Sequence, residues 1–475
     1  MTDDLTADHR LKGRMGTFSL VLSVLAFNGP LTVVVGYIPV TIAFGNGLGA
    51  PVAFIAAGVI IGIFAVGFTT MGRSLPNPGA FYAYITAGLG KPFGLGSSYL
   101  ALLSYFFILA NVTAFFGISL QSLVHDTLNG PDLPWWICST LLVVMTGVLG
   151  TLRIDFSVRV LGILLGAEFV LIMIYDAAVI FHGGAEGLSV TSFSWSEITS
   201  GSVGVAVLFA ITCFSGFEAT AIFREETRDP GRTITRSTYL AVIVIGVIYM
   251  VGAWVMIQAL GPGKAVASAA ADPTGSFYNT LQMYVGSVFV EIVKVFLCTS
   301  IFACSVSTHN VTTRYLFNLS IDGILPQGLS VVHKKFGSPS RASLATSVII
   351  FVGLGLLVAS NANPAILYAI LAGIGGYSLI LLLLFTSVAV VVYLKRAKSK
   401  VGIWKSTIAP VLATIGLLIA AVLATLNLDV LVGNPAVSTW ALVATFATIA
   451  VGIVHALILR KRRSPAYPRI GRQSV

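Results

Sequence analysis

Charged side chains are scarce in this chain. Asp, Glu, Lys and Arg make up 10% of the 475 residues, whereas 56% of the residues are hydrophobic. Soluble globular proteins carry about 25% charged residues. A chain of this length with so few charges cannot give a water-soluble particle a polar coat, so most of its surface must face lipid. The scarcity of charge excludes a soluble enzyme or binding domain and indicates a protein with many membrane spans.

Cysteine and the usual catalytic motifs are also scarce. The four cysteines form no CxxC pair and fall inside apolar segments, which is typical of small buried hydrophobes rather than metal or redox ligands. The chain contains neither HExxH nor GxSxG. We therefore expect no catalytic residues, no metal site, no cofactor and no enzyme activity.

The net charge of +10 does not indicate a nucleic-acid partner. Lys and Arg gather at the ends of apolar runs instead of covering one face of a soluble domain. This placement predicts that the chain binds the lipid bilayer and no nucleic acid.

A membrane-spanning helix needs about 20 apolar residues. Between charges and turn residues, the sequence predicts twelve such helices, at about 17–45, 50–72, 93–123, 134–151, 158–182, 200–226, 237–261, 285–316, 342–360, 366–394, 407–427 and 437–459.

Lys and Arg also predict the orientation of these spans. If the N-terminus is cytoplasmic, nearly all basic residues fall on the cytoplasmic side, and among the outer loops only Lys264 is basic. The first 14 residues are polar and do not resemble a signal peptide. We expect a multi-pass protein of the cell (inner) membrane, with both termini cytoplasmic. The predicted cytoplasmic tails are residues 1–16 and 460–475.

The first span contains a break. Its sequence is LAFNGPLTVVVGYIP, in which Asn28-Gly29-Pro30 is a turn signal. Proline lacks a backbone donor but favours the first position of a new helix. The segment is therefore predicted to form two half-helices that meet at Phe27, Asn28 and Gly29, and the second of these would offer N–H groups to a carboxylate. A plain proline kink is the alternative.

The sixth span contains a similar irregularity, FAITCFSGFEATAIFREE. Ser215-Gly216 weakens the helix, and Glu218 follows. Paired breaks in two halves of a membrane protein are the strongest sequence indication of a transporter site. The alternative is that Glu218 is simply solvated at the cytoplasmic interface.

Ionisable residues also occur inside spans five and eight. Glu168 lies deep in VLGILLGAEFVLIMIY, with Asp176 eight residues later on the same helical face. Burial favours the protonated form of a carboxyl and is typical of a proton carrier, although a structural acid bonded to a neighbouring helix is the alternative. Glu291 and Lys294 have i, i+3 spacing and are predicted to form an ion pair.

Three segments resemble motifs of the amino acid–polyamine–organocation (APC) superfamily of permeases. The loop REETRDPGRTITRSTY resembles the superfamily's loop after span six. The loop TRYLFNLSIDGILPQGLSVVHKKFGSPSRA resembles its loop after span eight, and PNPGAFYAYITAGLGKPFGLGSSY resembles its approach to span three. They occur in the family's order and cover about residues 14–394.

This resemblance implies a leucine-transporter-like all-α membrane fold with a 5+5 inverted repeat. The transport core would be 17–394, with repeats at about 17–182 and 200–394, followed by two additional C-terminal helices within 395–459. It also implies a substrate site at the two breaks. The positions that match the family's breaks are Ala26, Phe27, Asn28, Gly29 and Pro30 in span one and Phe214, Ser215, Gly216 and Phe217 in span six.

The sequence departs from the family's pattern at two places. Two glycines of the first break are replaced, which changes the carboxylate-binding backbone. Many sodium-independent members place a lysine in span five, where this chain has Glu168, so the lysine mechanism does not carry over.

We expect a secondary active transporter of amino acids, coupled to protons through Glu168 and Glu218. A polyamine or organic-cation transporter and a proton-independent exchanger are the alternatives within transport. A channel or receptor would keep the helices but would not need paired breaks.

Overall fold

The structure is a computed structural model that describes residues 16–75, 80–152, 158–218, 230–397 and 401–471. The predicted N-terminal tail lies outside these residues except for Gly16, as does part of the loop after span six. The described residues form helices and turns without any strand.

Eleven helical segments of the described chain are long and apolar enough to cross a membrane. The first is interrupted and consists of α1 (Thr17–Asn28), α2 (Pro30–Thr32), η1 (Val33–Tyr37) and α3 (Ile38–Phe44). The other ten are α4 (Ala50–Ser74), α6 (Lys91–Ser122), α7 (Trp135–Leu152), α8 (Val158–His182), α12 (Pro230–Leu260), α15 (Ser287–Ile321), α16 (Ser340–Ala359), α17 (Pro364–Arg396), α18 (Ala409–Val432) and α19 (Pro435–Lys461).

The predicted sixth span is the exception to this pattern. In its described part, residues 200–218, α10 (Val203–Thr212) is the helical segment, and its 10 residues are too few to cross a membrane by themselves. With α10 included, each of the twelve predicted spans coincides with a helical segment, and the prediction of an all-α membrane protein is confirmed.

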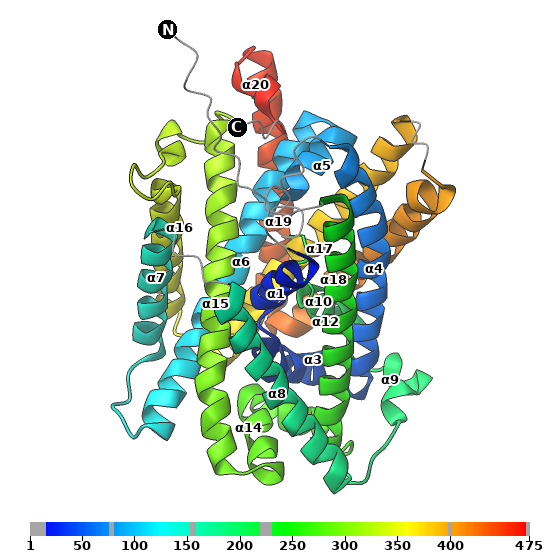
Figure 1. Ribbon diagram of the computed structural model, residues 1–475, viewed down its shortest axis with the longest axis vertical. Coiled ribbons are helices and arrows are strands. Elements are labelled where there is room, and N and C mark those ends of the chain that lie inside the picture. The colour runs from blue at the N-terminus through cyan, green and yellow to red at the C-terminus, as the bar shows by residue number, and fades with distance from the viewer. Residues whose placement is uncertain (1–15, 76–79, 153–157, 219–229, 398–400, 472–475) are drawn as a thin grey trace.

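Shorter helices lie at the two ends of the bundle (Figure 1). The segments α5 (Ala80–Leu89) and α20 (Ala466–Arg469) occupy one end, and α9 (Trp195–Ile198) and α14 (Pro273–Tyr284) the other. Between the predicted spans 237–261 and 285–316, the chain forms α14 and also α13 (Ala265–Ala271).

Several helices begin at a polar residue followed by proline. Asn363, Asn434 and Asp272 each accept a hydrogen bond at 2.9 Å from the backbone N–H of the second or third residue of α17, α19 and α14. A proline follows each of them at the first helical position. The N–H that proline lacks would have no helical partner at this position, so no hydrogen bond is lost. These short signals fix where the helices start.

Glycine allows some helices to touch backbone to backbone. A Cβ atom on Gly452 of α19 would lie 2.7 Å from Cα of Gly96 in α6. Such close approach strengthens packing between membrane helices. The outer helices expose large apolar residues, such as Leu426 and Trp440, which suits a lipid environment.

Candidate functional site

The break in the first span is confined to one residue. Helix α1 continues through Asn28, Gly29 has the left-handed φ of +56°, and the chain resumes helical structure at Pro30. Ala26, Phe27 and Asn28 are therefore helical residues next to the break, and the structure is not a plain kink in one continuous helix.

The carbonyls one turn before the break belong to the regular helix. Val24 and Leu25 both lie within α1, so their carbonyls are not unwound. The Val24 carbonyl accepts a hydrogen bond from Asn28 Nδ2 at 3.3 Å, and the Leu25 carbonyl accepts one from the Gly29 N–H at 3.0 Å.

The break in the sixth span is longer. After Thr212 the chain forms turns as far as residue 218, and Gly216 has a φ of +95°. The N–H groups of Phe214 and Ser215 donate to carbonyls only three residues back, both at 3.0 Å. The predicted interruption at Ser215-Gly216 is present.

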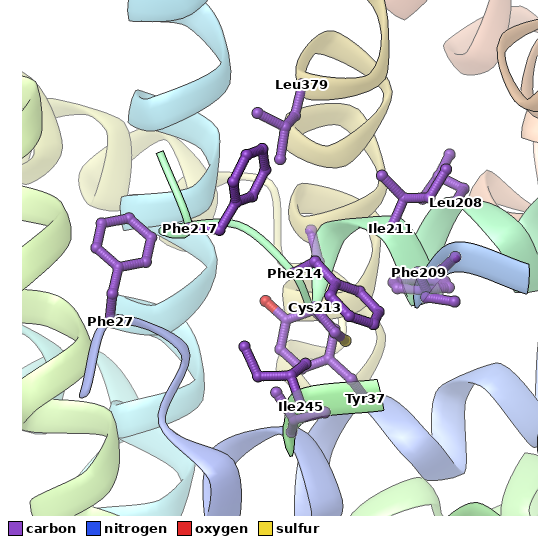
Figure 2. Close-up of a cluster of buried hydrophobic side chains, with 14 of the residues drawn as sticks. Phe27, Tyr37, Leu208, Phe209, Ile211, Cys213, Phe214, Phe217, Ile245 and Leu379 are labelled. Atoms are coloured by element: carbon purple, nitrogen blue, oxygen red, sulfur yellow. The ribbon is translucent and has the colours of Figure 1, made fainter. Parts of the chain in front are cut away.

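The two breaks touch through Phe27. A Cβ atom on Gly216 would lie 2.4 Å from the Phe27 ring, so this ring lies directly on the Gly216 backbone. Figure 2 shows Phe27 on the first span and Phe217 on the irregular chain beyond α10. The exposed fractions of Phe27, Phe214 and Phe217 are 3%, 0% and 1%, so the breaks are closed off from solvent.

The other two phenylalanines pack on helices α4 and α12. Phe217 makes edge-on contacts with Phe64 and Phe68 of α4, with ring centroids 5.8 and 6.0 Å away. Phe214 lies against Gly58 of α4 and also close to Gly246 of α12. Phe27 thus bridges the two breaks, and Phe214 and Phe217 anchor the irregular chain to its neighbours.

Glu168 belongs to α8, and its carboxyl group lies against the start of the second half of span one. It is 2% exposed on α8, and its Oε2 accepts hydrogen bonds from the Leu31 N–H at 3.2 Å and from Ser300 Oγ of α15 at 2.9 Å. Thr32 Oγ1 in turn donates to Ser300 Oγ at 3.1 Å. Pro30 has no N–H, so Leu31 provides the first backbone donor of this half-helix, and a carboxylate of the protein itself occupies it.

Glu218 belongs to the second break. It is 3% exposed; its Oε2 accepts the Gly216 N–H at 2.8 Å, and its Oε1 accepts the Tyr105 hydroxyl of α6 at 2.7 Å. A solvated Glu218, the alternative drawn from the sequence, is contradicted by this burial. Each break thus combines a glycine at positive φ with a nearby N–H that is bound to a buried carboxylate.

Neither acid has a buried basic partner. Among the described residues the buried charged and polar side chains include no Lys and no Arg. The described residues also contain no cluster of three or more His, Cys, Asp or Glu side chains that could hold a metal. Within the described part of the chain, neither acid therefore has a buried Lys or Arg beside it.

Sequence reasoning missed the partners of these acids. Ser300 and Tyr105 come from α15 and α6, far away along the chain, and nothing distinguishes Ser300 from the other hydroxyl residues of α15. The Leu31 N–H was missed in part because any residue type except proline can supply it.

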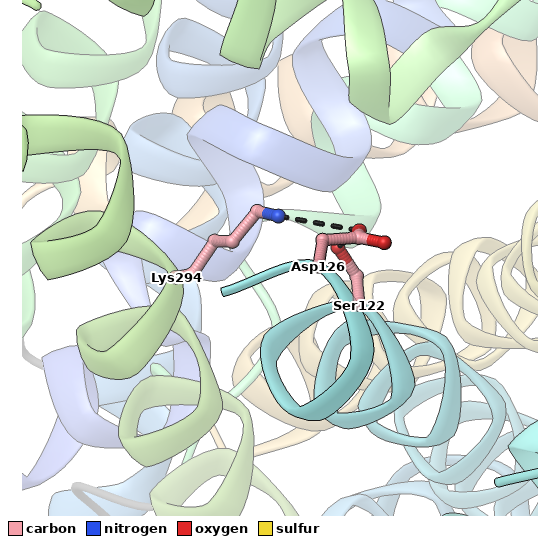
Figure 3. Close-up of polar contacts among 3 residues, drawn as sticks. All are labelled: Ser122, Asp126 and Lys294. Atoms are coloured by element: carbon pink, nitrogen blue, oxygen red, sulfur yellow. Dashed lines mark hydrogen bonds and ion pairs between the residues drawn. The ribbon is translucent and has the colours of Figure 1, made fainter. Parts of the chain in front are cut away.

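The predicted ion pair in span eight is wrong. Lys294 pairs with Asp126 at 3.4 Å and not with Glu291, and Asp126 also accepts a hydrogen bond from Ser122 at 2.6 Å (Figure 3). Asp126 and Ser122 lie where α6 continues into η3 (Leu123–Thr127). The favourable spacing along one helix is outweighed by a partner on another helix.

The chain is similar in sequence to known permeases and importers. The chain is 24% identical to the low-affinity putrescine importer PlaP of Escherichia coli (strain K12) over 66% of this chain and 67% of the relative. It is 23% identical to the branched-chain amino acid permease BcaP of Lactococcus lactis subsp. cremoris over 61% and 64%. It is 24% identical to the gamma-aminobutyric acid permease of Bacillus subtilis over 77% and 74%.

The sequence model of a single family, described as amino acid permease, matches residues 20–465. This match covers both breaks, Glu168 and nearly all of the helical bundle. It makes the chain a multi-pass membrane transporter and not an enzyme, and the chain belongs to the amino acid permease family.

Proposed function

We propose that this protein carries amino acids or related amines across the cytoplasmic membrane by proton-coupled symport with alternating access. The proposal rests mainly on one observation: each of two touching helix breaks holds a buried carboxylate bound to a backbone N–H. Buried acids inside a membrane are costly and are typical of proton and substrate pathways.

The substrate site in this proposal consists of the break residues themselves. They are Ala26, Phe27, Asn28, Gly29 and Pro30 of the first span, and Phe214, Ser215, Gly216 and Phe217 of the sixth. Backbone groups left unpaired at such breaks bind the polar ends of a substrate, and Phe27 would have to move to admit one.

Glu168 and Glu218 are the proposed proton carriers. A carboxyl can take a proton on one side of the membrane and release it on the other if the two conformations hydrate it differently. The shared end of α5 and α20 is proposed to face the cytoplasm, which would place the C-terminus inside the cell.

Uptake into proteoliposomes tests the coupling. With a labelled amino acid and amine panel, an acidic exterior should drive accumulation of a substrate at least about tenfold above its equilibrium level, because one pH unit stores 1.36 kcal/mol per proton. Glu168→Gln and Glu218→Gln keep the shape of the protonated acid but cannot release a proton, so at least one should lose accumulation while retaining exchange. Equal accumulation by the wild-type protein with and without the pH gradient would contradict symport and favour exchange.

A further inference from the structure

The N-terminus of the half-helix after Gly29 is already occupied by an anion. Such an end attracts negative groups because its N–H groups lack helical partners and its dipole is positive there. In transporters with broken helices, a substrate carboxylate is the usual partner of this end. Here the Leu31 N–H and the Ser300 hydroxyl both donate to Glu168 Oε2, at 3.2 and 2.9 Å.

A second carboxylate would bind poorly beside Glu168. Two carboxylates that share a desolvated site repel each other, and like charges placed together at a binding site cost several kcal/mol. No Lys or Arg is buried among the described residues, so none of these residues supplies a buried cation to offset that repulsion. A substrate that brings positive charge and no carboxylate avoids this cost.

The second oxygen of Glu168 is available to such a cation. Both hydrogen bonds to this carboxyl group end on Oε2, and Oε1 accepts none from a described residue. Oε1 therefore keeps its capacity to accept a hydrogen bond from an ammonium group.

A tyrosine provides an independent indication of an unfilled polar position. The Tyr249 hydroxyl of α12 is fully enclosed and has no hydrogen-bond partner among the described residues, although buried polar groups are nearly always paired. It lies within electrostatic range of Glu168. An ammonium group near Glu168 would be a suitable donor to this hydroxyl oxygen.

We infer that Glu168 is a specificity-determining residue that stands in for a substrate carboxylate, so that the site prefers amines without a carboxylate to the corresponding amino acids. This inference rests on the proposed function of the breaks as the substrate site. It also narrows the two proposed proton carriers to one: Glu168 stays charged opposite the bound ammonium, and Glu218 alone carries the coupling proton.

Equilibrium binding to the purified full-length protein tests this preference without any pH gradient. The probes are three pairs that differ only in the carboxylate: 1,4-diaminobutane and ornithine, 3-methylbutylamine and leucine, and 2-phenylethylamine and phenylalanine. Ligand-induced thermal stabilisation gives an apparent affinity for each compound. We expect at least one amine to bind about tenfold or more tightly than its parent amino acid. Amino acids that bind as tightly as their amines, or better, would overturn the inference.

Substitution of Glu168 adds a second, independent readout. Glu168→Gln removes the charge at nearly constant shape, so the preference for the amine over the amino acid should fall at least about tenfold. Asp176→Asn is the matched control, since Asp176 is a partly buried acid on the same helix, eight residues further from the break. The Asp176→Asn protein should prefer the amine over the amino acid to the same extent as the wild type. An unchanged preference in a folded Glu168→Gln protein would overturn the inference.

The failure of this inference and that of the proposed function are distinguishable. Binding preference is measured without a gradient, whereas coupling is measured as accumulation under one. A protein that prefers amino acids but still accumulates them under a pH gradient would refute the role of Glu168 alone.

Discussion

At the first break the carboxylate comes from another membrane span, whereas at the sixth it comes from the broken segment itself. Glu168 reaches the Leu31 N–H from α8, 137 residues away, while Glu218 folds back onto Gly216 two residues before it. The first arrangement ties α8 and α15 to α2, so α8 cannot move away from the break without losing the bond. The second is local and can move as one unit, with Tyr105 as its external partner.

This difference suggests separate tasks for two acids that look alike in the sequence. A carboxylate shared between spans suits a fixed charge that a substrate meets. A carboxylate held by its own turn and one hydroxyl suits a group whose surroundings change when the break moves. The experiments below either remove this distinction or make it sharper.

The largest effect is expected from closing the first break. Gly29→Leu would place a side chain at a φ of +56°, with its Cβ 2.8 Å from Thr32 Oγ1 and 2.9 Å from Ser300 Oγ. Strain at such a position costs about 1–2 kcal/mol, and the contact would push Ser300 away from Glu168. We expect substrate binding to fall below detection while the protein still inserts and elutes as a monodisperse species.

Gly166→Leu is the control for this change. Gly166 lies on α8, two residues before Glu168, and a Cβ atom there would meet nothing within 4 Å. It should bind substrate like the wild type. Normal affinity in Gly29→Leu would mean that the first break does not contact the substrate.

The contrast between the breaks shows what a sequence can and cannot predict. Asn28-Gly29-Pro30 and Ser215-Gly216 marked both interruptions, because proline and glycine affect the backbone locally. The membrane spans could be predicted equally well, because a lipid bilayer requires long apolar runs. Both signals depend on residues adjacent in the chain.

The hydrogen-bond partners of the two acids could not be predicted, because they depend on packing between segments that are distant in the sequence. Ser300 and Tyr105 reach the breaks only once α15 and α6 are in place. The same limit explains Lys294, which pairs across helices with Asp126 and not with Glu291 on its own helix. The sequence indicated which acids matter but not which donors hold them.

An intermediate effect is expected from removing the hydroxyl partner of each acid. Ser300→Ala deletes one of the two donors to Glu168, and Tyr105→Phe deletes the donor to Glu218 Oε1. Hydrogen bonds to charged groups contribute about 1.5–3 kcal/mol. Ser300→Ala should reduce the preference for amines several-fold and leave pH-driven accumulation unchanged. Tyr105→Phe should reduce pH-driven accumulation and leave the preference for amines unchanged.

Ser305→Ala on α15 is the control for these variants. Ser305 is also buried, but its hydroxyl donates to the Ile301 carbonyl of its own helix at 2.7 Å. It should change neither preference nor accumulation. If Ser300→Ala and Tyr105→Phe alter the same property, the two breaks are not functionally distinct.

The smallest effect, a pH-dependent change in melting temperature, is expected at a third acid. Like Glu218 it accepts a hydrogen bond from a tyrosine hydroxyl, but it lies outside the spans. Asp322 follows the end of α15; its Oδ2 accepts the Tyr82 hydroxyl of α5 at 3.0 Å, and Tyr82 accepts the Gly471 N–H of the C-terminal segment at 2.7 Å. Burial raises the pKa of Asp322 to about 6, against the smaller opposing effects of Tyr82 and Arg469.

The sign of the resulting pH effect follows from this raised pKa. The folded protein holds the Asp322 proton more tightly than the unfolded chain, so its contribution to stability is greatest near pH 4 and declines as the pH rises toward 6 and above. Asp322→Asn has no proton to lose. Relative to this variant, the wild type should gain melting temperature between pH 7 and pH 4, because a pKa raised by about two units corresponds to about 3 kcal/mol. A constant difference between the melting temperatures of the two proteins across that range would show that Asp322 has an ordinary pKa. A tyrosine hydroxyl bound to a buried acid would then not by itself indicate a proton site.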